Sequence, residues 1–235
     1  MKKILAYSIL AFASIFAFAG DAASFDDIGF SKDGKYYIFG TYGKTDKEYK
    51  AWAEIYTVDV EKNDFVKGEV YKINLSGKDS EISGKNCYLQ LKADSEWRLA
   101  KYEAKPADAE TLLFLRESEK KDPEAEIVFQ DFEASKNGEK IYYHVKLIPT
   151  FEGKGKNVKS KFYIDVKRQN EDGEVISSWK VGSPDIKRKG ITSYQIDRIF
   201  TDKSGKNLVF IIQKTLEDSK GTSIRYMVET YTIDN

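Results

Sequence analysis

The stretch GFSKDGKYYIFGTYG, residues 29–43, predicts two β-strands joined by a tight turn. Asp33-Gly34 stands between two apolar runs, and this dipeptide favours a hairpin because glycine adopts the positive φ of the turn without a steric penalty. After the polar loop 44–50, residues 53–60 alternate with period two and are rich in β-branched and aromatic side chains. That pattern predicts a third, half-buried strand beside the hairpin.

The same order of hairpin, polar loop and strand occurs twice more in the chain. The hairpins of the second and third copies cover residues 129–148 and 196–213, with turns at Asn137-Gly138 and Ser204-Gly205. The strands that follow these hairpins are predicted at 161–166 and 224–234. In every copy an acidic residue stands near the end of the last strand: Asp59, Asp165 and Asp234. Three such matches indicate a repeated structural unit.

The repeat predicts a mainly β protein whose antiparallel sheets are built from three hairpin-plus-strand units. Each unit resembles a blade of the secreted β-propellers, in which a segment such as FSPDGKYIAF precedes a strand ending in I-Y-x-x-D. The turn glycines at 34, 138 and 205 are spaced more widely and less evenly than the ~40–45 residues of a blade repeat. Because a closed propeller also needs at least ~4 blades, a sandwich or open barrel of about a dozen strands fits equally well.

The segment between the first two units predicts two further strands, 70–75 and 112–115, and one helix. Residues 87–102 are ambiguous, because two patterns overlap there. One helical face carries Leu89, Ala93, Trp97 and Ala100, whereas Cys87, Leu89 and Leu91 alternate as in a strand. We expect a helix over 94–102 that ends before Pro106, since proline breaks a helix. The fold is therefore expected to contain at most one or two short helices.

The first 19 residues have the features of a signal peptide. Lys2 and Lys3 supply a positive start, residues 4–19 are apolar apart from two serines, and Ala17-Phe18-Ala19 matches the small-residue pattern of a signal-peptidase site. The apolar stretch is shorter than the ~20 residues of a membrane-spanning helix. We therefore expect residues 1–19 to be removed, and residues 20–235 to form a single β-rich domain, periplasmic or secreted, without a transmembrane segment.

Charge and cysteine content limit the possible partners. Lys plus Arg and Asp plus Glu both number 38, so the formal net charge is zero. A nucleic-acid-binding protein needs a basic excess or a basic face, so nucleic acid is not expected as a partner. Cys87 is the single cysteine, which excludes a disulfide within the chain. A buried, apolar role suits this cysteine, and an intermolecular disulfide is the alternative.

The sequence offers little catalytic or metal-binding potential. His144 is the single histidine and lies in a regular strand pattern, so we assign no catalytic residue. One histidine and one cysteine cannot supply the three nitrogen or sulfur ligands of an ordinary zinc site. The acidic turns lack the spaced carboxylates of a calcium loop and are typical of side chains that bond to their own backbone. No metal and no cofactor are expected.

Three weaker features could serve binding or hydrolysis. Two candidate carboxylate pairs, as a glycosidase would need, are Asp26 with Asp27 and Asp131 with Glu133. Exposed tryptophans could stack on sugars or peptides, and the three candidates are Trp52, Trp97 and Trp179. A small basic cluster, Lys187-Arg188-Lys189, could meet an acidic partner. Each feature also has an ordinary structural explanation as a solvated loop charge or as sheet packing.

The chain resembles a family of predicted secreted bacterial proteins that is known only as a domain of unknown function. The resemblance rests on GFSKDGKYYIFGTYG and AEIYTVDVEKNDFV, on IVFQDFE, KFYIDV and VGSPDIKRKGITSYQI, and on LVFIIQK and SIRYMVET. It implies export and a single-domain extent, and it implies no activity. From the residues themselves we expect a non-catalytic binding or assembly role in the cell envelope, with an envelope protein or a glycan as partner. The alternative is a periplasmic hydrolase that uses carboxylates.

Overall fold

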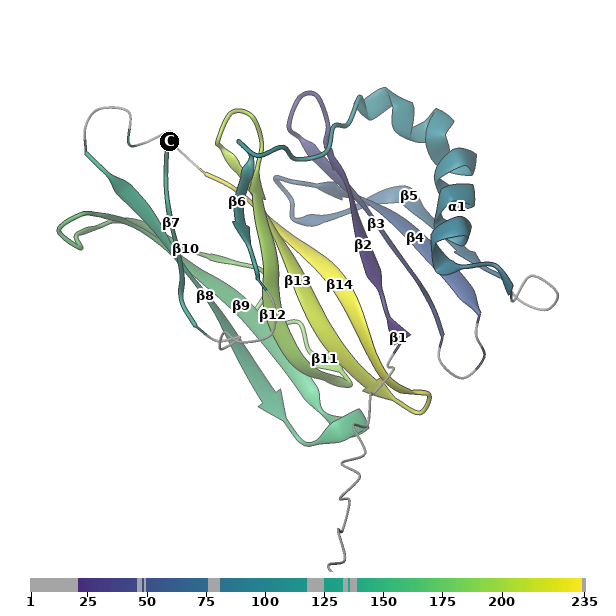
Figure 1. Cartoon of the computed structure of the whole chain (residues 1–235). Coiled ribbons are helices and arrows are strands. Elements are labelled where there is room, and N and C mark those ends of the chain that lie inside the picture. The colour runs from purple at the N-terminus through teal and green to yellow at the C-terminus, as the bar shows by residue number, and fades with distance from the viewer. Residues whose placement is uncertain are drawn as a thin grey trace, which may run out of the picture.

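Each of the three predicted units forms a run of antiparallel strands in the computed structural model (Figure 1). The structure describes residues 21–45, 48, 50–75, 81–117, 125–132, 135 and 139–233. The predicted signal peptide, Glu133, the turn Asn137-Gly138 and Asp234 lie outside these ranges. Within them, no helix has both the length and the apolar character needed to cross a bilayer.

The first unit and the strand after it form a four-stranded antiparallel meander, the N-terminal sheet. Its strands are β2 (Ser24–Phe30), β3 (Tyr36–Lys44), β4 (Ala51–Asp59) and β5 (Asp64–Asn74). The β2–β3 turn has Gly34 at φ 73°, as the Asp-Gly signal predicts. The strand predicted at 70–75 is the second half of the longer β5.

The second unit forms the outer sheet, in the order β10-β9-β8-β7, with β11 also paired to β9. These strands are β7 (Ile127–Gln130), β8 (Ile141–Glu152), β9 (Lys159–Asn170), β10 (Val175–Val181) and β11 (Arg188–Lys189). A short 3-10 turn, η4 (Gly155–Asn157), joins β8 to β9. The predicted pairing of the hairpin strands with each other and with the strand after them is therefore confirmed.

The third unit forms the central sheet, in the order β1-β14-β13-β12-β6. Its strands are β1 (Asp21–Ala22), β6 (Leu112–Leu115), β12 (Ile191–Thr201), β13 (Asn207–Asp218) and β14 (Gly221–Thr232). Gly205 adopts φ 68° in the β12–β13 turn, which confirms the second turn prediction that the structure describes. β1 pairs in parallel with β14, so the two ends of the described chain meet in one sheet.

The central sheet is covered on both faces, and this explains its unusual sequence. Leu208, Phe210 and Ile212 of β13 pack against the outer sheet. Val209 and Ile211, on the opposite face, pack against the N-terminal sheet. A strand buried on both sides reads as a continuous apolar run instead of an alternating one, as LVFII does. Each such side chain contributes about 1.5–3 kcal/mol when it is fully buried, so β13 forms the middle of the core.

One helix covers the free face of the N-terminal sheet, so the order of layers is outer sheet, central sheet, N-terminal sheet and helix (Figure 1). α1 (Gly84–Leu99) continues into the 3-10 turn η2 (Ala100–Tyr102). Its start is capped by Ser83, whose Oγ accepts the backbone N–H of Asn86 at 3.1 Å. The described residues contain three sheets, fewer than the ~4 or more blades of a closed propeller.

The helix differs from the prediction in its start and in its buried face. It begins at residue 84 instead of near 94, and it buries Cys87, Tyr88, Leu91 and Leu99. The predicted face of Leu89, Ala93, Trp97 and Ala100 is exposed. The reason is a contact that helical periodicity does not reveal. Gly40 of β3 has no side chain, and the ring of Tyr88 fills the space beside it. A Cβ atom at Gly40 would lie 2.4 Å from Cε2 of Tyr88.

Candidate functional site

Two hairpin turns from different sheets meet at one end of the molecule, which we call the turn end (Figure 1). They are the β2–β3 turn, residues 31–35, and the β12–β13 turn, residues 202–206. Asn207 joins them, because its Nδ2 donates a hydrogen bond to the backbone oxygen of Gly34 at 3.2 Å. The repeated unit therefore brings equivalent turns together in space.

The two turns share one hydrogen-bond pattern, with serine and aspartate exchanged. In the first, Ser31 Oγ donates to Asp33 at 2.6 Å, and the Gly34 N–H donates to the Ser31 oxygen at 2.9 Å. In the second, Ser204 Oγ donates to Asp202 at 2.7 Å, and the Gly205 N–H donates to the Asp202 oxygen at 3.0 Å. These carboxylates hold their own turns, which is the structural role expected for acidic turn residues.

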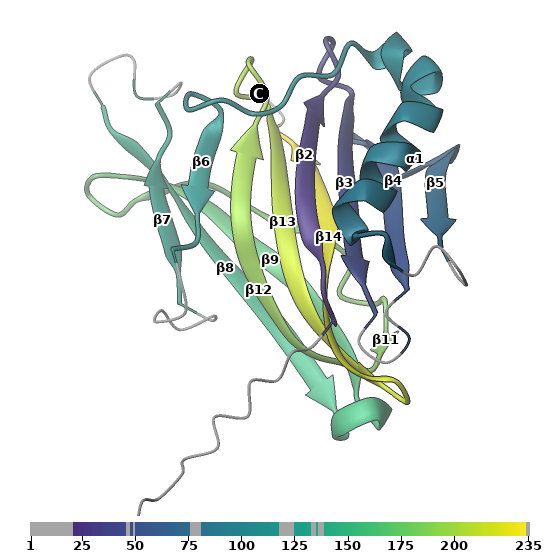
Figure 2. The ribbon, with the colours of Figure 1, turned by 45° about the vertical axis from the view of Figure 1, so that its right-hand side comes forward.

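A connecting segment, the strap, crosses both turns on its way from η2 to β6 (Figure 2). The strap comprises residues 103–111. The Lys105 N–H donates to the Phe30 oxygen at 3.0 Å, and the Ala107 N–H donates to Asp27 Oδ2 at 2.7 Å. Further along, Asp108 accepts the hydroxyl and N–H of Thr111 at 3.0 and 3.1 Å. The strap is thus anchored to β2 and closed by its own turn.

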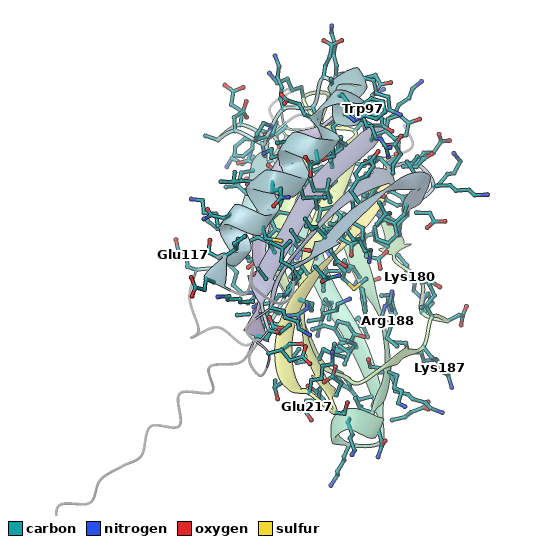
Figure 3. The ribbon with its side chains drawn as sticks, turned by 90° about the vertical axis from the view of Figure 1, so that its right-hand side faces the viewer. Trp97, Glu117, Lys180, Lys187, Arg188 and Glu217 are labelled. Carbon is teal, nitrogen blue, oxygen red and sulfur yellow. The ribbon has the colours of Figure 1, made fainter. Side chains whose placement is uncertain are left out.

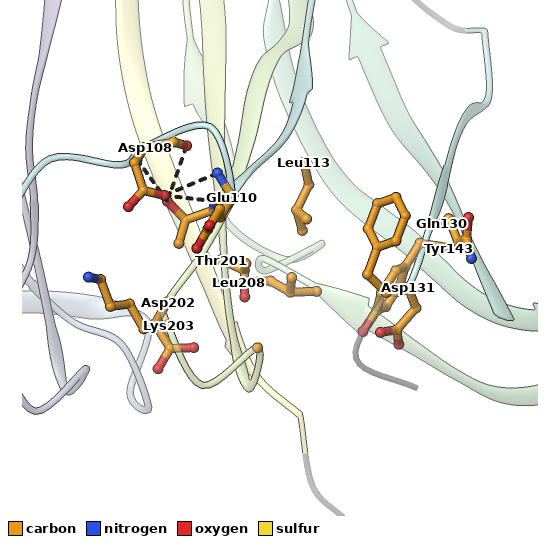
Figure 4. A pocket seen from close by; sticks show the side chains of 13 residues that line it. Asp108, Glu110, Leu113, Gln130, Asp131, Tyr143, Thr201, Asp202, Lys203 and Leu208 are labelled. Carbon is orange, nitrogen blue, oxygen red and sulfur yellow. Dashed lines mark hydrogen bonds between the residues drawn. The ribbon is translucent and has the colours of Figure 1, made fainter. Parts of the chain in front are cut away.

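A cavity of about 590 Å³ lies between the strap and the two turns. Its lining includes Phe30, Lys105, Pro106, Thr201, Lys203 and Lys206. A second cavity of about 240 Å³ continues toward the outer sheet and shares part of this wall. Figure 4 shows the second cavity, with Asp108 and Glu110 on one side, Gln130 and Tyr143 on the other, and Leu113 and Leu208 between.

The carboxylates around the larger cavity have partners, whereas the ammonium groups of Lys105 and Lys206 have none among the described residues. Lys203 interacts electrostatically with Asp108 and helps to lower the pKa of that carboxyl. Hydrogen bonds from Ser31 and from Thr111 lower the pKa of Asp33 and of Asp108, so both are ionised at neutral pH. Glu103 pairs with Lys32 at 2.8 Å. Among the described residues, by contrast, no carboxylate lies within 4.0 Å of three ammonium groups, those of Lys105, Lys203 and Lys206.

Thr201 lies in the wall that the two cavities share. Its side chain is 8% exposed, and its Oγ1 has no hydrogen-bond partner among the residues that the structure describes. Its backbone N–H, in contrast, donates to the Thr111 oxygen at 2.9 Å. A buried hydroxyl without a partner costs free energy.

The residues considered for acid–base or metal chemistry do not assemble at the turn end. His144 lies on β8, where its Nδ1 is 3.1 Å from Glu126 Oε2, and it lines neither cavity. Cys87 is buried under α1, and burial raises the pKa of its thiol. Within the described ranges, no group of three or more His, Cys, Asp and Glu side chains is arranged to hold a metal ion.

The candidate carboxylate pair Asp26–Asp27 is not assembled in the structure, and only one member of the second pair is described. Asp26 and Asp27 are neighbours on β2 and point to opposite faces of the sheet: Asp26 meets Tyr88 of the helix, and Asp27 accepts the Tyr37 hydroxyl at 2.8 Å. Asp131 pairs with Arg168 at 2.8 Å, and Glu133 lies outside the described residues. Asp131 lines the smaller cavity, so it is the member of these pairs that reaches the site.

The tryptophans and the basic cluster are placed mainly by packing. Trp52 is buried beneath the guanidinium of Arg225, and Trp179 stacks on Tyr231 with ring centres 5.0 Å apart. Trp97, in contrast, is 72% exposed near the end of α1 (Figure 3). Within the basic cluster, Arg188 contacts Glu229 at 3.4 Å and Lys187 lies 3.7 Å from Glu152.

Sequence reasoning missed Thr201 and the cavity lysines Lys105, Lys203 and Lys206. The signal that could have located them is the similarity of the predicted units, because corresponding turns of similar units can lie at one end of packed sheets. Lys203 and Lys206 flank the predicted Ser204-Gly205 turn, and Lys105 directly precedes the proline that ends the helical region.

Comparison with known proteins identifies a family. A family model described as Predicted secreted protein (DUF2259) matches residues 38–232. No curated protein and no solved structure matches the chain. The matched residues include most of β3, all of β4, β5 and α1, and the β12–β13 turn, whereas β2 and the β2–β3 turn precede them.

Proposed function

The chain belongs to this family of predicted secreted proteins, and from that premise we propose that it is a non-catalytic binding protein of the cell envelope. Its ligand occupies the cavity at the turn end. The observation that carries the proposal is this cavity of about 590 Å³, framed by two hydrogen-bonded turns and an anchored strap. Ligand sites usually have ~300–1,000 Å³, and recognition commonly uses loops held on a rigid scaffold.

The protonation state of the lining acids supports binding over hydrolysis. A glycosidase needs one carboxylic acid with a raised pKa to donate a proton, beside a second carboxylate. At the turn end, the pKa values of Asp33 and Asp108 are lowered by their hydrogen bonds, so neither is a proton donor at neutral pH. A hydrolase working through carboxylates is therefore the less favoured alternative.

We test the binding function with a panel of neutral and acidic envelope saccharides, measured by thermal shift and NMR titration. The blocking variant is Pro106→Trp, because Pro106 is exposed and lines the cavity. Its matched control is Ala109→Trp, which adds the same ring at an exposed strap position outside both cavities. We expect at least one saccharide to bind the wild type and the Ala109→Trp variant and to show no binding to the Pro106→Trp variant.

Two results would overturn this proposal. One is the absence of any binding across the panel, and the other is binding that Pro106→Trp leaves unchanged while its circular dichroism matches that of the wild type. Mass spectrometry of the recovered saccharide distinguishes binding from hydrolysis, since a binding protein releases its ligand intact and a hydrolase releases fragments.

The proposed location in the periplasm or outside the cell depends on removal of residues 1–19. β1 starts at Asp21, directly after the predicted cut, and Asp21 is buried where it meets Arg225 at 2.5 Å. N-terminal sequencing of the exported protein should begin at or near Gly20. A sequence that begins at Met1 would contradict the assignment.

A further inference from the structure

We propose that the turn-end cavity binds a short acidic oligosaccharide, with Lys105, Lys203 and Lys206 facing its negative groups. This inference rests on the proposed binding function and names its ligand class. It depends on a difference between the charged groups that line the larger cavity: the carboxylates have hydrogen-bond or ion-pair partners, whereas the ammonium groups named above have no carboxylate close by.

The larger cavity is lined by equal numbers of acidic and basic side chains, but the acidic and basic groups differ in whether they already have a partner. Each lining carboxylate is already occupied: Asp33, Asp108 and Asp202 hold their own turns, and Glu103 pairs with Lys32. The ammonium groups of Lys105, Lys203 and Lys206 have no carboxylate within 4.0 Å among the described residues. Lys203, which interacts electrostatically with Asp108, lines the same cavity. An incoming anion can therefore pair with Lys105 and Lys206 without displacing an existing partner, whereas the carboxylates of this larger cavity already have partners.

The dimensions of the site favour a saccharide over a simple inorganic anion. The two cavities, of about 590 and 240 Å³, are adjacent, because both are lined by Asp108, Thr111, Thr201, Asp202 and Lys203. The smaller cavity is lined by Phe132, whose side chain is 68% exposed. An exposed aromatic ring offers a flat apolar face for stacking, and the face of a sugar ring is a suitable partner.

The geometry assigns complementary parts of one ligand to the two cavities. Lys203 lines both cavities, and Lys105 and Lys206 line the larger one, so the acidic groups belong there. A sugar ring stacked on Phe132 then extends the chain toward the outer sheet. The negative group is a carboxylate of a uronic acid or a phosphate ester, which present the same oxyanion chemistry to lysine.

The test is isothermal titration of the whole mature protein with four probes at low salt. The probes are trigalacturonate, neutral maltotriose, glucose 6-phosphate and inorganic phosphate. We expect one of the two acidic sugars to bind at least about tenfold more tightly than maltotriose and than phosphate. The tighter of the two identifies the oxyanion, and a rise from about 0.05 to about 0.3 M salt should weaken its binding.

Single variants locate the contact. We expect the affinity for the acidic sugar to fall about three- to tenfold in each of the variants Lys105→Gln, Lys203→Gln and Lys206→Gln. Phe132→Ala should reduce the affinity for the oligosaccharide more than the affinity for the monosaccharide. The matched control is Lys146→Gln, an exposed lysine on β8 that lines neither cavity and should have no effect.

The outcomes separate this inference from the function on which it rests. If maltotriose binds as tightly as the acidic sugars and Pro106→Trp blocks it, the acidic ligand is wrong and the binding function stands. If the lysine variants behave like Lys146→Gln, or if inorganic phosphate binds as tightly as the sugars, the ligand assignment is likewise overturned. If none of the saccharides binds, both proposals fail.

Discussion

Single residues decide how closely the strap approaches β2. Gly29 has φ +106°, and a Cβ at this position would lie 1.7 Å from the backbone oxygen of Lys105. The strap could not keep its hydrogen bond to Phe30 with a side chain there. Gly29 is also the first residue of the stretch that predicts the first hairpin. The sequence around it does not reveal its contact with the strap, because the strap is distant in the chain.

We predict that Gly29→Ala lowers the free energy of unfolding far more than Gly68→Ala does. Gly68 also has a positive φ, +80°, but a Cβ there meets nothing within 4 Å. Gly68→Ala therefore carries only the conformational penalty of about 1–2 kcal/mol, whereas Gly29→Ala adds a backbone clash. Urea denaturation of both variants measures the difference, and equal losses would contradict the close approach of the strap.

A second residue, Asp27, links the strap to pH. Its carboxylate accepts the Ala107 N–H and the Tyr37 hydroxyl, and desolvation raises its pKa above the usual range despite these bonds. A raised pKa means that the folded state binds the proton more readily than the unfolded chain. As the pH falls through this raised pKa, protonation of Asp27 therefore increases the free energy of unfolding. The gain is complete below the pKa of the carboxyl in the unfolded chain, about 3.9.

Asp27→Asn should remove this dependence. The amide retains an acceptor for Ala107 without the cost of burying a charge, so we expect a free energy of unfolding equal to or above that of the wild type at pH 7. The difference between wild type and variant should shrink on acidification toward pH 4. Urea denaturation at several pH values, with Asp27→Ala as the control that loses the acceptor, measures it. A variant that is less stable than wild type by a constant amount would refute the linkage.

At the scale of elements, α1 shows which of two apolar faces a helix buries. Leu91 is 7% exposed against the N-terminal sheet, whereas Leu89 is 51% exposed on the opposite side. The helix has no strong one-sided pattern, so its orientation is decided by the sheet beneath it. Gly40 there leaves room for Tyr88, and the hydroxyl of Tyr88 donates a hydrogen bond to Asp26.

The two leucines provide a matched test of this orientation. Leu91→Ala should cost about 2–4 kcal/mol, since it leaves a cavity beneath the helix. Leu89→Ala should change stability by no more than about 0.5 kcal/mol, because its side chain is largely in water. Thermal and urea denaturation of the pair measure both values. The reverse order would mean that the helix buries the face carrying Leu89 and Trp97.

At the scale of the whole molecule, the central sheet connects the layers. The outer sheet packs on one of its faces and the N-terminal sheet on the other, and β1 joins the start of the described chain to β14. The outer sheet shares its core with the central sheet, whereas the N-terminal sheet packs against the central sheet on one face and forms a second core with α1 on the other. The turn end depends on the same arrangement, because its two turns belong to the N-terminal and central sheets.

This arrangement predicts one cooperative unfolding transition for residues 20–235, which we propose to be a single domain. Calorimetry of the mature protein should give a ratio of calorimetric to van't Hoff enthalpy close to one. Two separate transitions, or a transition in which the N-terminal sheet and α1 melt alone, would show that the chain contains more than one folding unit.

The elements were largely predictable from the sequence, and the site was not. Alternating β-branched and aromatic residues identify strands such as β4 and β9, and glycine at positions 34 and 205 marks two turns. The buried face of α1 could not be chosen, because Leu89 and Leu91 both lie on apolar faces. The cavity could not be predicted either, since Lys105 and Lys203 line it from segments that are distant in sequence.

The sequence alone determined the mainly β fold, since strand patterns and turn glycines are properties of neighbouring residues, and it predicts the export signal on the same kind of local evidence. Only the tertiary structure decided the order of the layers, the face that the helix buries and the meeting of the two turns. These depend on packing between distant segments, as when Asn207 of one unit hydrogen-bonds to Gly34 of another. Such contacts leave no local periodicity, and the candidate ligand site is built entirely from them.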